Sequence, residues 1–89
     1  MIRPGDVVYS KSGRDSGRYF AVVALEGENY VRIADGDVRR LKNAKLKNVR
    51  HLKVTGDRLE RIAEKLEAGA QVFDSELYSA LRLYDKNRT

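Results

Sequence analysis

The chain has 89 residues, which is enough for one domain and too few for two independent hydrophobic cores. It is 42% hydrophobic and 35% charged, and it contains no cysteine, which excludes a disulfide framework and a thiolate metal site. Residues 1–53 carry 12 Lys and Arg against 6 Asp and Glu, whereas residues 54–89 carry 6 against 7. This excess of cations in the first part indicates a polyanionic partner. The alternative is a basic surface that only keeps the protein soluble.

No stretch approaches the ~20 consecutive apolar residues that a membrane-spanning helix needs. The N-terminal MIRPGDVV also lacks a long apolar run. We therefore expect no membrane partner and no signal peptide. Together with the missing cysteines, this favours the cytoplasm.

Short strands joined by turns are predicted for the first part of the chain. Residues 19–25 have apolar side chains on both alternating faces, which is typical of a central strand buried on both sides. The next candidate alternates, with Val31 and Ile33 facing inward, and Asp35-Gly36 after it is a strong hairpin signal. Five short strands joined by tight turns imply a small, bent antiparallel barrel, whose closure would remove exposed sheet edges. The predicted strands cover residues 7–9, 19–25, 30–34, 38–41 and 49–54, with a basic connector at 42–48.

At Thr55 the hydrophobic period changes from about 2 to about 3.6 residues. Gly69 is a stop signal for a first helix, and a second helix is predicted to start near Asp74. We expect a short helical hairpin whose apolar stripes pack on the barrel, the alternative being a docking face for a protein partner. The two stripes are Leu59, Ile62, Ala63 and Leu66, then Leu77, Ala80, Leu81 and Tyr84.

The segment SKSGRDSGRYF, residues 10–20, carries more than a turn between two strands requires. A hairpin loop needs about two residues, yet this one adds the mutually repelling cations Lys11, Arg14 and Arg18. Gly13 and Gly17 accept positive φ and let the backbone approach an anion closely, while Arg and Lys supply charge and donors. The combination predicts a loop that contacts phosphates.

These residues resemble a known motif. GDVVYSKSGRDSGRYFAVVALEGENYVRIADG, residues 5–36, is similar to the KOW motif of ribosomal proteins and transcription elongation factors, and Gly17 falls where that family has its hallmark glycine. The continuation YVRIADGDVRRLKNAKLKNVRHL resembles the short KOW-domain RNA-binding proteins of bacteria, which are similar to KOW-containing large-subunit ribosomal proteins of archaea and eukaryotes. The resemblance covers residues 5 to about 54. It implies an SH3-like barrel and RNA binding, most often in a ribosomal setting.

The run VRRLKNAKLKNVRHLK, residues 38–53, contains no acidic residue. A solvated surface normally mixes signs, so this run favours phosphate binding over a merely soluble face. Tyr30 and Arg32 share a face of their strand, as a base-stacking platform needs, whereas Tyr9, Tyr19 and Phe20 are expected to fill the barrel. The cations of the run are Arg39, Arg40, Lys42, Lys45, Lys47, Arg50 and Lys53.

Enzymatic chemistry finds little support in the sequence. His51 is the only histidine, so no multi-histidine metal site can form. Asp35 and Asp37 are expected to be turn residues rather than an acid–base pair. GRDSGR lacks the GKS or GKT ending and the following helix of a P-loop. We therefore predict no catalysis, no metal, no cofactor and no small-molecule substrate.

The predicted fold is mainly β with C-terminal α: an SH3-like, five-stranded antiparallel barrel over residues 1–54, followed by a helical hairpin over 55–89 packed on the same domain. The predicted function is non-catalytic binding of structured ribosomal RNA through the loop and the basic run. The alternative is a protein-interaction module of the transcription or translation machinery that uses the barrel or the helices. The expected RNA-binding residues are Lys11, Gly13, Arg14, Gly17, Arg18, Tyr30, Arg32, Arg39, Arg40, Lys42, Lys45, Lys47, Arg50 and Lys53.

Overall fold

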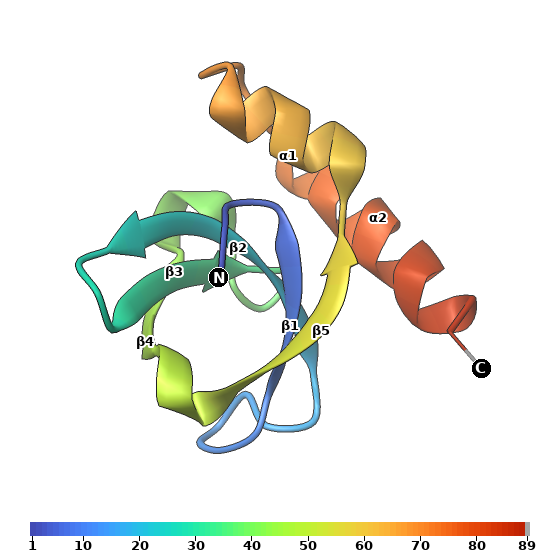
Figure 1. The fold of residues 1–89 in the computed structure, drawn as a ribbon. Coiled ribbons are helices and arrows are strands. Elements are labelled where there is room, and N and C mark those ends of the chain that lie inside the picture. The colour runs from blue at the N-terminus through green and yellow to red at the C-terminus, as the bar shows by residue number, and fades with distance from the viewer. Residues whose placement is uncertain (89) are drawn as a thin grey trace.

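The computed structural model describes residues 1–88 and shows one antiparallel sheet with two helices (Figure 1). This arrangement confirms the predicted class, mainly β with C-terminal α. The strands are β1 (Asp6–Ser10), β2 (Tyr19–Glu26), β3 (Tyr30–Ala34), β4 (Lys45–Asn48) and β5 (Leu52–Arg58). The helices are α1 (Glu60–Glu67) and α2 (Asp74–Lys86), and single 3₁₀ turns lie at η1 (Leu41–Asn43) and η2 (Val49–His51).

The sheet is strongly curved, and its strands pair in the order β4-β3-β2-β1-β5 (Figure 1). Within residues 1–88 no ladder joins β4 to β5, so the sheet is open at the place where the predicted barrel would close. Other contacts tie β4 and η2 to the β1–β2 loop. Lys47 Nζ on β4 donates to the Ser12 carbonyl oxygen at 3.0 Å, and the Lys11 N–H donates to the His51 carbonyl oxygen at 2.9 Å.

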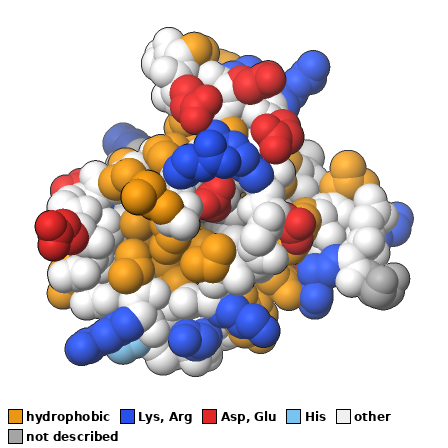
Figure 2. Space-filling view, in the orientation of Figure 1, with side chains coloured by type: hydrophobic (Ala, Val, Ile, Leu, Met, Phe, Trp, Pro, Cys, Tyr) orange, Lys and Arg blue, Asp and Glu red, His pale blue; other side chains and the backbone are white. Residues whose placement is uncertain are grey.

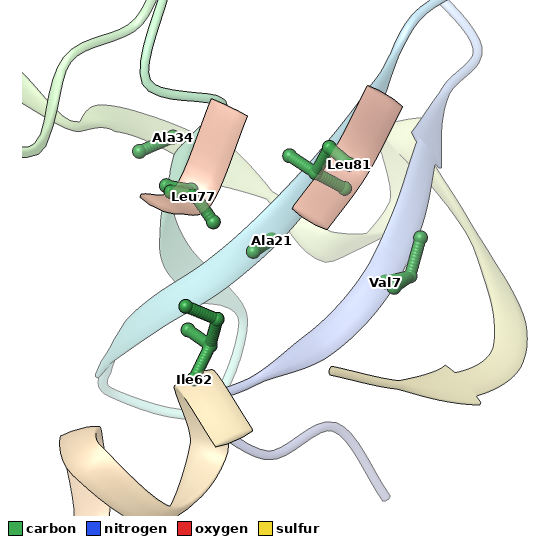
Figure 3. Close-up of a cluster of buried hydrophobic side chains, with 6 residues drawn as sticks. All are labelled: Val7, Ala21, Ala34, Ile62, Leu77 and Leu81. Atoms are coloured by element: carbon green, nitrogen blue, oxygen red, sulfur yellow. The ribbon is translucent and has the colours of Figure 1, made fainter. Parts of the chain in front are cut away.

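The curvature gives the sheet two apolar faces, and β2 contributes to both, as its sequence predicted. The face away from the helices is covered by the sheet itself and holds Val8, Phe20, Val22, Val31, Ile33 and Leu52. The outer face packs against both helices through Val7, Ala21, Ala34, Ile62, Leu77 and Leu81 (Figure 3). The apolar stripes of the helices are therefore buried on the sheet.

The predicted strand at 38–41 is wrong, because side chains take up the backbone hydrogen bonds of this segment. One carboxylate oxygen of Asp35 accepts the N–H groups of Asp37 and Arg39, each at 2.9 Å. Asp74, at the start of α2, accepts the N–H of Leu41 at 2.8 Å. The fourth strand instead forms at Lys45–Asn48, inside the predicted connector.

The last strand starts and ends later than predicted. Residues 49–51 form η2, and β5 then continues to Arg58, past the expected boundary at residue 54. The Thr55 hydroxyl donates to the Val7 carbonyl oxygen at 2.8 Å, and Arg58 pairs with Asp6 at 3.2 Å. These contacts extend the β1–β5 pairing into residues 55–58, which were predicted to belong to the helical part, so the helical part begins only at Glu60.

Two glycines allow the helices to lie close to the sheet. A Cβ atom on Gly36 would overlap the carbonyl oxygen of Asp74 in α2, and one on Gly5 would overlap Ala63 in α1. Lys65 and Glu76 form an ion pair between the helices at 2.9 Å. In the part of the chain that the structure describes, neither helix has the length and apolar content needed to cross a bilayer.

Candidate nucleic-acid interface

The loop between β1 and β2 is fixed by ion pairs with the turn that follows β3. Asp15 is only 6% exposed and accepts a hydrogen bond from Nε of Arg39 at 3.0 Å. Arg18 lies 4.0 Å from the carboxylate of Asp35, which is also buried. Burial makes the Asp15–Arg39 pair sensitive to the loss of either partner. Arg39 therefore holds the loop in place, and Arg18 is partly engaged.

Gly13 and Gly17 have the positive φ predicted for them, +84° and +85°. The N–H of Gly17 donates to the Ser10 carbonyl oxygen at 3.0 Å, and the N–H of Ser16 donates to the Gly13 carbonyl oxygen at 3.2 Å. The backbone thus turns back on itself twice within a few residues. As a result Lys11 and Arg14 are exposed on a loop whose base is fixed.

Exposed cations gather where this loop meets η2 and the start of β5. The hydrogen bond between Lys11 and His51 places Lys11 beside the segment that carries Arg50 and Lys53. Figure 2 shows Lys and Arg side chains along the lower edge of the molecule, where the β1–β2 loop and η2 lie in Figure 1. We call this group the basic edge: Lys11, Arg14, Arg50 and Lys53.

No acidic side chain neutralises the basic edge within residues 1–88. None of its four side chains makes an ion pair or a hydrogen bond there, and the bond from Arg50 to Asn48 uses the Arg50 backbone N–H. The nearest acid in the sequence is Asp15, whose carboxylate is buried with Arg39. Exposed like charges without partners are the arrangement that attracts a polyanion.

The other predicted cations lie apart from the basic edge or are already bonded. Arg32 pairs with Glu26 at 3.2 Å and donates to the Ala44 carbonyl oxygen at 3.3 Å. Lys47 is bonded to the loop through Ser12. A second exposed group without ion pairs in the described chain surrounds η1 and the start of β4: Arg40, Lys42 and Lys45.

Tyr30 is 43% exposed and shares a face with Arg32, as predicted. Its surroundings do not favour a nucleic acid, however. Glu26 lies directly across from Tyr30 in the β2–β3 register and also binds Arg32. A carboxylate beside the ring repels a phosphate backbone, so the structure makes Tyr30 a weaker candidate than the sequence suggested.

The prediction that Tyr9 and Tyr19 fill the barrel interior is wrong. Val8 and Phe20 point inward and are fully buried, so their neighbours Tyr9 and Tyr19 lie on the outer face, where both are half-buried. The two tyrosines are paired across β1 and β2, with ring centroids 5.0 Å apart. The alternation of the strands was the signal in the sequence that could have placed them.

The end of α2 is tied to the end of β5 beside these rings. Tyr19 meets Tyr84 edge-on at 5.5 Å, and the Arg88 guanidinium lies 4.6 Å from the Tyr19 ring centre. The Tyr84 hydroxyl donates to Asp57 at 2.7 Å. Burial raises the pKa of Tyr84 above its ordinary value, and the bond to Asp57 raises it further. The hydroxyl therefore stays protonated and keeps this link at neutral pH.

Among residues 1–88 no group of His, Cys, Asp and Glu side chains is placed to hold a metal ion. His51 lies in η2, with Nδ1 3.0 Å from the Ser12 hydroxyl oxygen. No protein-family model matches the chain, and no curated protein matches it. The KOW resemblance therefore remains a prediction that rests on the motif itself.

Proposed function

We propose that the protein binds structured RNA without catalysis, through the basic edge. One observation carries this proposal: the cations of the edge are exposed and lack partners within residues 1–88, whereas nearby Arg39 is paired and partly buried. Bringing like charges together without counter-charges is unfavourable, and the phosphates of a nucleic acid relieve that cost. The KOW resemblance favours ribosomal RNA as the partner and the cytoplasm as the location.

The fold supports this function by holding the cations on a fixed frame. The Arg39–Asp15 pair and the bond from Lys47 to Ser12 restrain the loop from two sides. The bond from Lys11 to His51 ties the loop to η2. A restrained loop loses less conformational entropy on binding than a free one. Lys and Arg contacts to phosphates set position and affinity rather than sequence, so we expect recognition of RNA shape.

The salt dependence of binding tests the proposal. If the basic edge neutralises phosphates, log affinity falls linearly with log salt, with a slope of about −3 to −4 when the coefficient for duplex DNA is applied to its cations. The measurement is fluorescence anisotropy of a labelled, structured ribosomal RNA fragment at several salt concentrations. Affinity that does not change with salt would refute phosphate binding.

A specific observation supports a protein-interaction module as the second candidate. The end of β5 and the two helices surround an open groove of ≈ 1060 Å³, and Leu83 at its margin is 60% exposed. Because the helical stripes are buried on the sheet, a protein partner would use this groove rather than the stripes. This function predicts binding that is insensitive to changes at the basic edge.

A further inference from the structure

We propose that Tyr9, supported by Tyr19, stacks on an unpaired base of an RNA whose backbone is held at the basic edge. The inference rests on the proposed function and deepens it, because it specifies RNA with a single-stranded or flipped-out nucleotide next to the structured part. It is carried by the strand register, by two hollows that meet at these rings, and by the position of Tyr9 outside both apolar clusters.

The register of three adjacent strands places Lys53, Tyr9 and Tyr19 in one row across the sheet. Tyr9 is opposite Lys53 on β5 and opposite Tyr19 on β2. Residues paired in this way point to the same face, with Cβ atoms about 5 Å apart. Lys53 also belongs to the basic edge. An RNA chain with a phosphate bound at Lys53 would therefore bring the neighbouring base toward Tyr9.

Two surface hollows meet at the tyrosine pair. One, of ≈ 290 Å³, lies toward α2 and has Gly17 and Arg18 on its wall. The other, of ≈ 430 Å³, lies toward β5 and has Lys53 and Thr55 on its wall. Tyr9, Tyr19 and Arg88 line both. Tyr9 thus borders open space on two sides, which a planar base requires, whereas the Arg88 guanidinium lies over the Tyr19 ring.

The packing contact that Tyr9 makes is with the Tyr19 ring, 5.0 Å away. Tyr19 and Tyr84 pack against the cluster between sheet and helices, but Tyr9 belongs to neither apolar cluster. Among residues 1–88 no hydrogen bond reaches its hydroxyl group. A half-buried aromatic side chain outside the core, beside the unpaired cation Lys53, is the arrangement used to stack bases in single-stranded nucleic acid.

The mixed charge of these hollows favours a neutral base over a phosphate. Arg18, Arg82 and Arg88 face Asp35, Asp37 and Asp85 around the first hollow. Arg88 is bonded to Asp85 at 3.4 Å and lies over Tyr19, while Arg82 donates to the Tyr78 hydroxyl. The phosphate is therefore expected at Lys53, on the open side, and the base between the hollows.

The test compares three RNAs: a blunt hairpin, the same hairpin with a three-nucleotide overhang, and the same overhang made of abasic nucleotides. We expect the natural overhang to bind wild-type protein roughly 5- to 150-fold more tightly than the other two, the range that stacking of one base supplies. The abasic overhang keeps the phosphates, so it separates stacking from charge without altering the protein.

Tyr9→Leu keeps apolar bulk but removes the ring. We expect it to lose the preference for the overhang and to keep the affinity for the blunt hairpin. The control Phe73→Leu, at a ring that is 54% exposed and lines neither hollow, keeps both. Thermal unfolding shows whether each variant is folded. Blunt-hairpin binding with no preference for the natural overhang over the abasic one, or a preference that survives in folded Tyr9→Leu, overturns the stacking site alone. If no RNA binds, both the stacking site and the proposed function fail.

Discussion

Arg39 and Arg40 are neighbours in the chain but have different surroundings. Arg39 binds buried Asp15 across 24 residues of sequence, whereas Arg40 is exposed and has no ion pair within residues 1–88. The sequence shows a run of cations without an acidic residue between positions 38 and 53. It could not show which cations are engaged, because each partner lies on a distant segment that only the fold brings close.

At Gly17 the sequence and the structure agree, and a substitution follows from this. Its φ is +85°, and a Cβ atom there would meet only the Tyr9 hydroxyl, at 3.9 Å. In Gly17→Val the cost thus comes from the backbone conformation, and we expect a loss of roughly 1–3 kcal/mol in the free energy of unfolding. RNA affinity should also fall, because the loop that carries Lys11 and Arg14 must rearrange. Urea unfolding and anisotropy measure the two effects.

Gly27→Val is the matched control for this substitution. Gly27 lies in the β2–β3 turn with φ +72°, and no atom lies within 4 Å of its added Cβ. It should lose stability to a similar extent but keep its RNA affinity at a temperature where it is folded. Equal affinity loss in both variants would mean that the β1–β2 loop has no special part in binding.

At the scale of elements, the hydrophobic period correctly predicted the strands and the helix that pack on the core. It did not predict the segment whose N–H groups are bonded by side chains, or the strand at the edge of the sheet. The first three strands and the second helix lie within a few residues of their predicted bounds. β4 was missed because it is an edge strand of sequence KLKN, paired only with β3. Lysine is common on exposed edge strands, so this segment lacks the apolar residues by which the other strands were predicted. The strand expected at 38–41 failed because Asp35 and Asp74 bind its N–H groups.

The burial of α2 on the sheet leads to a contrast between two leucines. Leu77 is fully buried, and Leu83, on the same helix, is 60% exposed. Leu77→Ala should reduce the free energy of unfolding by roughly 2–5 kcal/mol, because it leaves a cavity between α2 and the sheet. Leu83→Ala should stay within about 0.5 kcal/mol of wild type. Urea unfolding measures both.

If Leu77→Ala unfolded at the same urea concentration as wild type, α2 would not be part of the cooperative unit. That result would also make its apolar stripe available to a protein partner and favour the interaction module. An affinity for blunt RNA that is unchanged in folded Leu83→Ala is expected, since Leu83 lines a groove that contains no residue of the basic edge.

For the molecule as a whole, the two ends differ in charge. Acidic side chains gather over α1 in Figure 2, at the end opposite the β1–β2 loop and η2. Such a distribution orients an approaching polyanion toward the basic edge. The sequence showed this imbalance, and the contact of the β1–β2 loop with phosphates stays a prediction. The sequence did not point to the proposed tyrosine site, which depends on the pairing of β1 with both β2 and β5 and thus on contacts between distant segments.

The most direct test of RNA binding at the basic edge compares two variants of equal charge. One is Lys11→Gln combined with Arg50→Gln, at the edge. The other replaces with glutamine two exposed cations at the α1 end that lack ion pairs within residues 1–88, Arg3 and Arg61. Anisotropy titrations with blunt structured RNA over a range of salt concentrations give the slope for each. The edge variant should bind more weakly than wild type, with a slope smaller by about 2, because two phosphate contacts are lost. The α1-end variant should keep the wild-type slope. Equal losses in the two variants, or no loss in either, would contradict binding at the basic edge.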